Sequence, residues 1–295
     1  MIQTPTQHAT IQADQILLTP FFGDKPTRRG QPDKSKANLK SNKVKGFMSS
    51  TVARKARKML SDWITAVTIK NEKRHIRNLP PGRLITFVTL TLPALQFHSD
   101  KEIKRRALVK FCQAICARFG VKNYYWRAEP QKNGNIHFHV IADKFIHWRS
   151  VRNLWNSCLE KLGYIDQFER KHGHRDPNST DIHGLRKIKS IVKYITKYCT
   201  KNSTDIPLEG HVHGRSDTLS KCAPILLRNG SMLQAVLDLA THYKLSTMYD
   251  DDFFQVYRMN VLQVLKRFCS PLYSLVLRSL EDNYKVLYGK NPLRF

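Results

Sequence analysis

The sequence predicts an α+β fold with a central antiparallel sheet flanked by helices. Two observations carry this prediction. The segments from residue 84 onward follow the order strand, helix, hairpin, helix, helix, which is typical of an α+β domain. Its second and third strands are separated only by Lys132-Asn133-Gly134, a hairpin signal.

The composition favours a protein that binds a polyanion. The chain has 295 residues, with 50 Lys and Arg against 23 Asp and Glu, which gives a formal net charge of +27. So large an excess repels itself unless a nucleic acid or an anionic membrane surface neutralises it. With 41% hydrophobic residues the chain can bury one sizeable core, so wholesale disorder is excluded and one or two domains are expected.

Nothing in the sequence indicates a membrane or secretory destination. No apolar run approaches the roughly eighteen residues of a membrane span, and the N-terminus lacks a signal-peptide pattern. The six cysteines form neither a disulfide framework nor a zinc pair, so we expect buried thiols. These features predict a cytoplasmic protein with no membrane partner.

Residues 1–47 are predicted to be a flexible basic arm. The stretch 25–58 holds twelve Lys and Arg and one acid, among residues such as Pro, Gly and Ser that have little to bury. We expect phosphate contacts here; a merely solubilising tail is the alternative. The expected DNA-binding residues of this part of the chain are Arg28, Arg29, Arg54 and Lys55.

An amphipathic helix is predicted over 48–79. Ser49-Ser50-Thr51 offers N-cap hydroxyls, and apolar residues then recur at helical spacing. Pro80-Pro81-Gly82 ends this helix and marks the boundary to the next domain.

The region 80–222 is predicted to hold the sheet and its helices. Residues 84–92 are β-branched and aromatic and stop at Pro93, as in a strand, and two further strands are expected at 123–131 and 135–142. Helices are predicted over 100–119, capped by Asp100, and over 148–162, each ended by a glycine. A loop at 171–179, a helix over 182–201 and a turn-rich stretch at 209–220 follow, and residues 223–295 are expected to be mostly helical with an open role.

A pair of histidines lies inside the third strand. Side chains alternate across a strand, so His137 and His139 share one face and can bind one metal ion together. The pairs His172/His174 and His211/His213 repeat the spacing, but they lie in Gly-bearing loops that fix no side-chain direction. Two sheet histidines with ordinary hydrogen bonds are the alternative for His137 and His139.

The third ligand depends on the register of the hairpin. A three-residue loop places Glu129 opposite His137 on the same face, whereas a two-residue Asn133-Gly134 turn sends Glu129 to the other face. We prefer the first register, because a buried carboxylate in an aromatic strand would otherwise need another partner. Two imidazoles and one carboxylate suit Mg²⁺ or Mn²⁺ gripping a phosphate, and also a ferrous oxygenase.

A tyrosine-rich helix favours the phosphate chemistry. Tyr194 and Tyr198 stand four residues apart and therefore on one helix face, with Lys197 on the neighbouring flank. A phenol with a reference pKa of about 10 needs such a cation to attack as phenolate at neutral pH. Simple packing of the two tyrosines against the sheet is the alternative.

Three segments together resemble the ordered motifs of the HUH endonucleases: Phe87-Val88-Thr89-Leu90-Thr91-Leu92, then Glu129 with His137-Phe138-His139, then Tyr194-Ile195-Thr196-Lys197-Tyr198. Within that superfamily the chain is most similar to two-tyrosine rolling-circle replication initiators of small single-stranded DNA phages and plasmids, over residues 84–202. The resemblance implies an HUH core of RRM or ferredoxin-like type.

The resemblance also implies a mechanism. One tyrosine attacks the scissile phosphodiester of a single-stranded origin, leaving a 5′-phosphotyrosine and a free 3′-OH, while a metal on His137, His139 and Glu129 orients the phosphate. The second tyrosine cuts the regenerated origin, and Lys197 stabilises the charge. Further DNA contacts are expected from Arg127, Lys193 and Lys201.

The implied partners are single-stranded DNA, origin duplex DNA, and a host helicase and polymerase in a bacterial cytoplasm. A separate helicase is expected because the chain contains no Gly-x-x-x-x-Gly-Lys-[Ser/Thr] loop.

Two other functions remain open from the sequence. An HUH transposase or plasmid relaxase would keep the chemistry and change the substrate. A non-catalytic DNA- or RNA-binding protein would use aromatics such as Tyr124, Tyr125 and Trp126 to stack bases. An oxygenase explains neither the charge nor the tyrosine helix.

Overall fold

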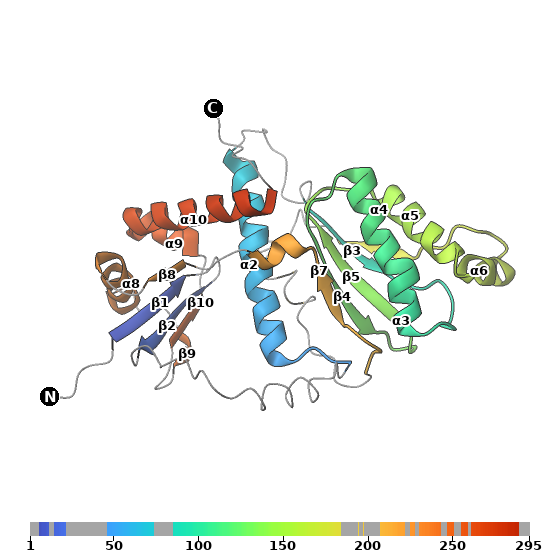
Figure 1. The fold of residues 1–295 in the computed structure, drawn as a ribbon, viewed down its shortest axis with the longest axis horizontal. Coiled ribbons are helices and arrows are strands. Elements are labelled where there is room, and N and C mark those ends of the chain that lie inside the picture. The colour runs from blue at the N-terminus through green and yellow to red at the C-terminus, as the bar shows by residue number, and fades with distance from the viewer. Residues whose placement is uncertain are drawn as a thin grey trace, which may run out of the picture. The chain divides into compact units, whose positions relative to one another are not determined.

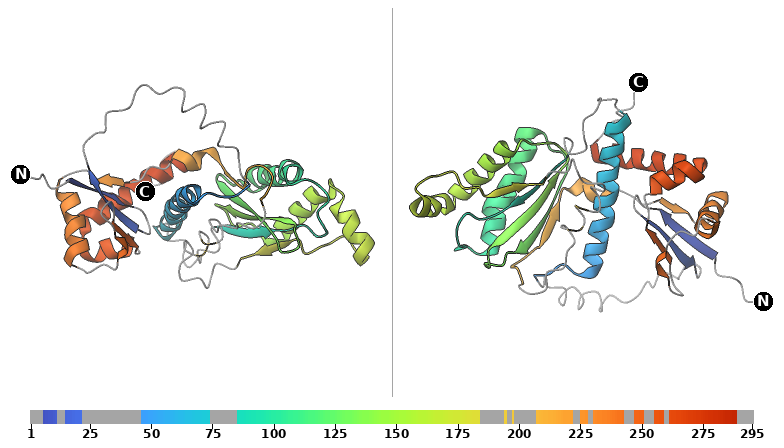
Figure 2. Two further views of the ribbon diagram at one scale, coloured as in Figure 1. Left: turned by 90° about the horizontal axis from the view of Figure 1, so that it is seen from below. Right: turned by 180° about the vertical axis from the view of Figure 1, so that it is seen from behind.

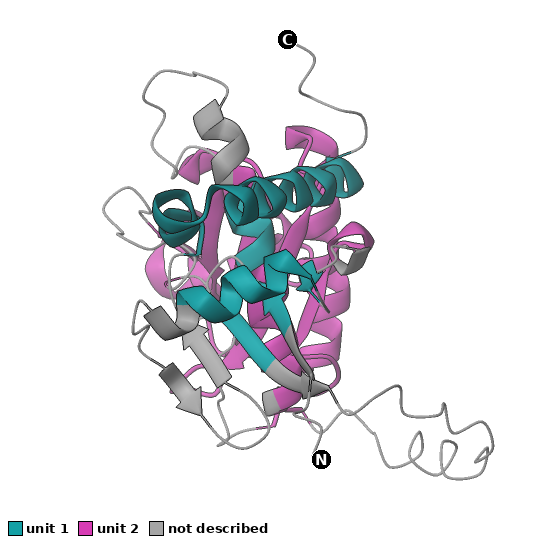
Figure 3. Ribbon diagram, turned by 90° about the vertical axis from the view of Figure 1, so that its left-hand side faces the viewer, with its two compact units in different colours: residues 1–41, 61–66, 221–295 teal, residues 42–60, 67–220 magenta. Residues whose placement is uncertain are grey.

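The chain folds into two compact units in the computed structural model (Figure 3). One unit comprises residues 1–41, 61–66 and 221–295, and the other comprises 42–60 and 67–220. The structure describes residues 6–11, 15–21, 46–73, 85–183, 194, 197, 207–221, 225–227, 230–242, 247–250, 255–258 and 261–288.

A five-stranded antiparallel sheet forms the centre of the second unit (Figure 1). Its strands lie in the order β6-β3-β5-β4-β7, and each pairs with its neighbour in antiparallel orientation. Their bounds are β3 (Thr86–Leu90), β4 (Tyr124–Pro130), β5 (Ile136–Ala142), β6 (Thr180–Ile182) and β7 (His213–Arg215). The predicted α+β fold and its three expected strands are confirmed.

Helices cover one face of this sheet, as the ribbon shows (Figures 1 and 2). Alternate strand residues such as Leu90 and Phe138 are fully buried in one apolar cluster with residues of the covering helices. This alternation leaves the side chains of the intervening residues to the opposite face. The helices are α3 (Asp100–Ile103), the π-helical turn η2 (Lys104–Leu108), α4 (Val109–Phe119) and α5 (Trp148–Glu160).

The helix ends follow the local sequence. Gly120 has a φ of 63° and donates its N–H to Cys116, which ends α4 in the left-handed conformation expected there. The first cap differs from the prediction: Ser99, not Asp100, is the N-cap of α3, because the Ser99 hydroxyl accepts a hydrogen bond from the Glu102 N–H. Trp155 of α5 donates its indole N–H to the Thr91 carbonyl at 2.8 Å and so joins α5 to the end of β3.

Two elements between α5 and the tyrosine segment differ from expectation. A helix that the sequence analysis missed, α6 (Tyr164–His172), follows Gly163 directly. The helix predicted from residue 182 does not begin there, since Thr180–Ile182 is strand β6, paired with β3. Tyr194 and Lys197 are helical, and the rest of 184–201 lies outside the described residues.

The predicted amphipathic helix is present as α2 (Ser50–Lys73). The Ser49 hydroxyl accepts a hydrogen bond from the Val52 N–H at 3.3 Å, as an N-cap does. Leu60, Trp63 and Ile64 form part of its buried face, and the outer residues Arg54 and Lys55 are exposed. The boundary expected at Pro80-Pro81-Gly82 lies outside the described residues.

The first unit corrects two expectations. Thr6–Ile11 (β1) and Gln15–Phe21 (β2) form an antiparallel pair, so these segments of the predicted flexible arm are part of a sheet. Arg28 and Arg29 lie outside the described residues. The C-terminal region adds three strands to the expected helices, and the sheet order is β8-β1-β2-β10-β9. These elements are β8 (Ile225–Leu227), α8 (Ser231–His242), β9 (Thr247–Asp250), β10 (Gln255–Arg258), α9 (Val261–Phe268) and α10 (Ser270–Tyr288).

Candidate metal centre

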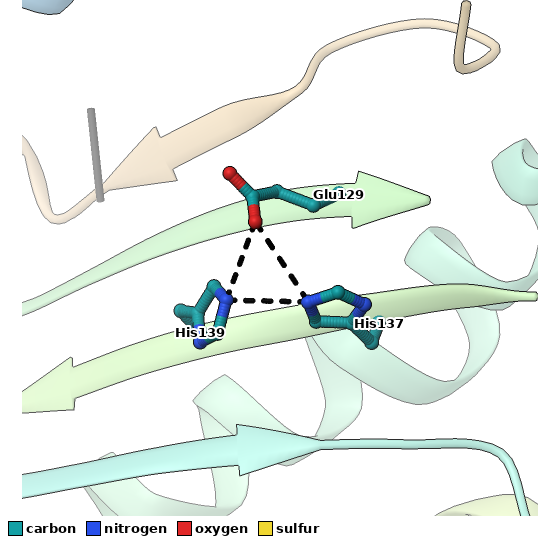
Figure 4. A group of neighbouring side chains, drawn as sticks. All are labelled: Glu129, His137 and His139. Carbon is teal, nitrogen blue, oxygen red and sulfur yellow. Dashed lines mark hydrogen bonds and ion pairs between the residues drawn. The ribbon is translucent and has the colours of Figure 1, made fainter. Parts of the chain in front are cut away.

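Glu129, His137 and His139 converge on the sheet face opposite the helices (Figure 4). Strands β4 and β5 pair with Glu129 directly opposite His137, and Gln131 donates its N–H to the Asn135 carbonyl at the hairpin end. The expected three-residue register is therefore confirmed. The carboxylate Oε2 lies 3.4 Å from His139 Nε2 and 3.8 Å from His137 Nε2, and the two ring nitrogens are 3.2 Å apart.

These donor atoms fit a divalent cation. Two ligands at right angles around Mg²⁺, each at about 2.1 Å, lie about 3 Å apart, close to the spacings observed. Burial lowers the pKa of His137 to about 4, which keeps that imidazole neutral and its lone pair free to bind at neutral pH. Glu129 Oε1 is buried without a hydrogen-bond partner among the described residues, as a carboxylate oxygen near a metal ion would be.

A buried arginine accompanies the carboxylate. Arg127 lies two residues before Glu129 on β4, its side chain is 1% exposed, and its Nε is 3.9 Å from Glu129 Oε1. Its guanidinium also donates to the Val212 carbonyl at 3.1 Å. Such burial does not favour the direct DNA contact expected from the sequence; it places a fixed positive charge beside the metal ligands instead.

Thr89 and His183 extend the site away from the triad. Thr89 of β3 lies directly opposite His139 of β5, and its Oγ1 is 3.0 Å from His139 Nδ1. The same Oγ1 is 2.8 Å from His183 Nε2. His183 follows β6 and was not among the predicted site residues; its signal in the sequence is a lone histidine directly after a short strand segment.

Tyr194 joins this network through His183. The Tyr194 Oη is 3.1 Å from His183 Nδ1. Phe87 supports both rings, since it stacks on His183 at a centroid distance of 4.4 Å and meets Tyr194 edge-on at 6.0 Å. Lys197 is exposed, and the other predicted residues of this segment, Lys193, Tyr198 and Lys201, lie outside the described residues.

The other His-x-His pairs differ from the strand pair. His172, His174 and His211 are exposed, as expected of loop residues. His213, however, belongs to strand β7, where it lies opposite Arg127 and stacks on Tyr125. Burial, together with the charges of Arg127 and Arg215, lowers the pKa of His213 to about 4.

The strand aromatics do not form an open stacking platform. Tyr125 is fully buried, and Tyr124 and Trp126 pack partly against the apolar cluster. Base stacking by all three, which the non-catalytic alternative invoked, therefore does not fit this strand.

The fold and the site define an α+β protein with an HUH-like core and a possible two-histidine, one-glutamate metal centre. Residues 85–203 match the family described as Replication-associated protein ORF2/gene II protein. The matched stretch contains β3, the metal triad and the tyrosine segment, and the match supports a role in replication initiation with DNA as the partner.

Comparison with curated proteins gives no significant match, and comparison with solved structures gives none either. Within the described part of the chain, no helix has both the length and the apolar character that crossing a membrane requires.

Proposed function

We propose that this protein nicks and rejoins single-stranded DNA to start and terminate rolling-circle replication of a phage or plasmid genome in a bacterial cytoplasm. The observation that carries the proposal is the link from the metal triad to Tyr194: a phosphate-binding centre and a phenol are joined by Thr89 and His183 on one sheet face.

In the proposed reaction, Tyr194 Oη attacks the scissile phosphorus and the bond from phosphorus to O3′ breaks. The phenol loses its proton, and the departing O3′ gains one and becomes the free 3′-OH that primes synthesis. The phosphate stays on Tyr194 as a 5′-phosphotyrosine. A bound Mg²⁺ or Mn²⁺ supplies Lewis-acid polarisation of the phosphate. No nucleotide is consumed, because one phosphate ester replaces another.

Other residues of the chain have supporting roles in this proposal. Glu129, His137 and His139 hold the divalent cation, and Tyr198 serves as the second nucleophile when the origin is regenerated. Lys197 stabilises the phenolate or the charge on the phosphorus. Lys193, Lys201 and the basic residues Arg28, Arg29, Arg54 and Lys55 follow the DNA backbone. A host helicase and polymerase complete the reaction.

The test is covalent capture of DNA. The purified full-length protein is incubated with Mg²⁺ or Mn²⁺ and labelled single-stranded oligonucleotides that tile the replicon carrying its gene, and the products are run on a denaturing gel. We expect a protein-linked band that needs metal, is lost in the Tyr194→Phe, Tyr198→Phe double variant and is lost in His137→Ala.

Matched controls are Tyr273→Phe, from α10, and His174→Ala, from the exposed His172-Gly173-His174 loop. Both should keep the band. Tight binding without a covalent band on any oligonucleotide would leave a non-catalytic DNA-binding protein. Cutting only at the ends of a mobile element or at a transfer origin would identify a transposase or a relaxase.

A further inference from the structure

A continuous hydrogen-bond chain connects a metal ligand to the proposed nucleophile. It runs from His139 Nδ1 to Thr89 Oγ1 at 3.0 Å, from Thr89 Oγ1 to His183 Nε2 at 2.8 Å, and from His183 Nδ1 to Tyr194 Oη at 3.1 Å. Both ring nitrogens of His183 therefore take part, one toward each end of the chain.

The sheet backbone fixes the middle of this chain. Thr89 is paired directly with His139 on β5 and with Asp181 on β6. His183 donates its backbone N–H to the Phe87 carbonyl at 2.9 Å, and its ring stacks on the Phe87 ring. Three neighbouring strands thus hold the threonine and the histidine in register, so the contact is built into the fold.

Proton counting allows the chain only two directions. The Thr89 hydroxyl has one hydrogen, so between two ring nitrogens it donates to one and accepts from the other. A neutral imidazole likewise has one N–H and one acceptor nitrogen. Once one member of the chain is fixed, the donors and acceptors of all the others follow.

The metal site fixes one end. His139 Nε2 faces Glu129 Oε2 and His137 Nε2, so it is the nitrogen that would bind the cation, and a ligating nitrogen carries no proton. The proton of a neutral His139 then lies on Nδ1 and is donated to Thr89. Thr89 donates to His183 Nε2, and the remaining His183 proton lies on Nδ1, toward the Tyr194 oxygen.

We propose that His183 is a positioning residue that donates a hydrogen bond from Nδ1 to Tyr194 Oη, and that cation binding at His139 selects this direction through Thr89. A donor aimed at the phenol oxygen stabilises the phenolate. In the opposite direction the Tyr194 hydroxyl donates to His183 and the neutral phenol is favoured. The cation thus prepares the tyrosine by orienting protons through three hydrogen bonds.

Burial supports a neutral His183. It lowers the pKa of this histidine, against the opposing influence of the Asp181 carboxylate on β6 and with the influence of His139 on β5. Tyr194 and Phe87 face the ring from the other sides. The direction of the hydrogen bonds does not depend on what the protein does with DNA, but the phenolate's use as a nucleophile rests on the proposed function.

The first test reads protons directly. Full-length protein labelled with ¹⁵N-histidine is studied by long-range ¹H–¹⁵N NMR, with Mg²⁺ and with EDTA, and His183 is assigned from the spectrum of His183→Asn. With Mg²⁺ we expect His183 protonated on Nδ1. We expect the proportion of this tautomer to fall in EDTA, and to be the same with and without Mg²⁺ in Thr89→Val, which lacks the connecting hydroxyl.

Each alternative result has a distinct meaning. A His183 protonated on Nε2 in Mg²⁺ overturns the donor role. A tautomer that is the same in Mg²⁺ and EDTA overturns the coupling. If Mg²⁺ shifts neither the His137 nor the His139 resonances, the metal centre itself is wrong and the inference falls with it. None of these readouts requires cleavage of DNA, so they separate this inference from the proposed function.

The second test is the pH profile of covalent adduct formation. Loss of a hydrogen bond to a charged oxygen predicts adduct formation about tenfold to a hundredfold slower in His183→Phe at pH 7. The deficit should narrow toward the ordinary phenol pKa of about 10. His183→Asn, which keeps an N–H donor near the Nδ1 position, and Thr89→Ser should lose less. An equal deficit at every pH would show a merely structural role and overturn the proposal.

Discussion

Glu129 and His137 lie directly opposite each other in the β4–β5 hairpin, and the carboxylate Oε2 is 3.8 Å from the ring Nε2. This pairing makes a carboxylate and two imidazoles neighbours, because His139 follows on the same face of β5. A one-residue shift in pairing would move Glu129 to the face covered by helices. The register of one short hairpin therefore decides whether the chain has a metal centre.

Removing the charge of Glu129 should weaken metal binding. We expect Glu129→Gln to reduce Mn²⁺ affinity at least about tenfold, since an amide oxygen lacks the charge that hard divalent cations favour. Isothermal titration calorimetry measures the change. Glu102→Gln, which alters an exposed carboxylate on α3, is the control. Equal affinity in Glu129→Gln and wild type would contradict the proposed ligand set.

The hairpin turn should depend on Gly134. Its φ of 86° is in the left-handed region, and a Cβ there would meet no atom within 4 Å, so the cost of a side chain is purely conformational. Gly134→Ala should lose about 1 to 2 kcal/mol of unfolding free energy in urea titrations. Asn tolerates this conformation better, so Gly134→Asn should lose less, and a larger loss for Asn than for Ala would refute this account.

Gly214 should be required for a different reason. A Cβ at this position would lie 2.6 Å from the Trp126 ring, so β7 can approach β4 only because no side chain intervenes. We expect Gly214→Ala to lose about 1 to 3 kcal/mol of unfolding free energy through overpacking. In a Trp126→Ala background the same change should cost much less. If the two effects simply add, the close contact is not the cause.

Stability should fall in acid partly through His213. Its pKa is lowered from 6.5 to about 4 in the folded state, so between these values the unfolded chain binds more protons and stability is lost as the pH falls. The contribution of one such histidine reaches at most about 1.4 kcal/mol per pH unit. Urea unfolding in EDTA from pH 8 to 4.5 should show a shallower dependence for His213→Gln than for wild type, and identical slopes would contradict it.

Local features were predictable from the sequence. The Ser49 cap, the Gly120 helix end and the strand carrying His137 and His139 follow from residue types and spacings within a few positions of one another. The placement of Glu129 was predictable once a three-residue turn was preferred, because that hairpin is also local in sequence. The cap at Ser99 was missed because two adjacent residues, Ser99 and Asp100, were both plausible caps.

Long-range pairing was not predictable in this way. Strands β1 and β2 lie in a sheet with β8, β9 and β10, from the far end of the chain, although the basic stretch next to them favoured an arm. Strand β6 is three residues long and exists because it pairs with β3, so its sequence carries little signal of its own. His213 was misplaced in a loop for the same reason, since β7 is a three-residue edge strand beside β4.

The sequence by itself determined the two histidines on one strand face, the nearby glutamate, the strong positive charge and the tyrosine segment, because periodicity and composition act locally. Only the tertiary structure decided that Thr89 lies between His139 and His183, that His183 reaches Tyr194, and that Arg127 is buried beside Glu129. These contacts join residues that are far apart in the chain or hidden by burial. Antiparallel pairing across three strands is what brings them together.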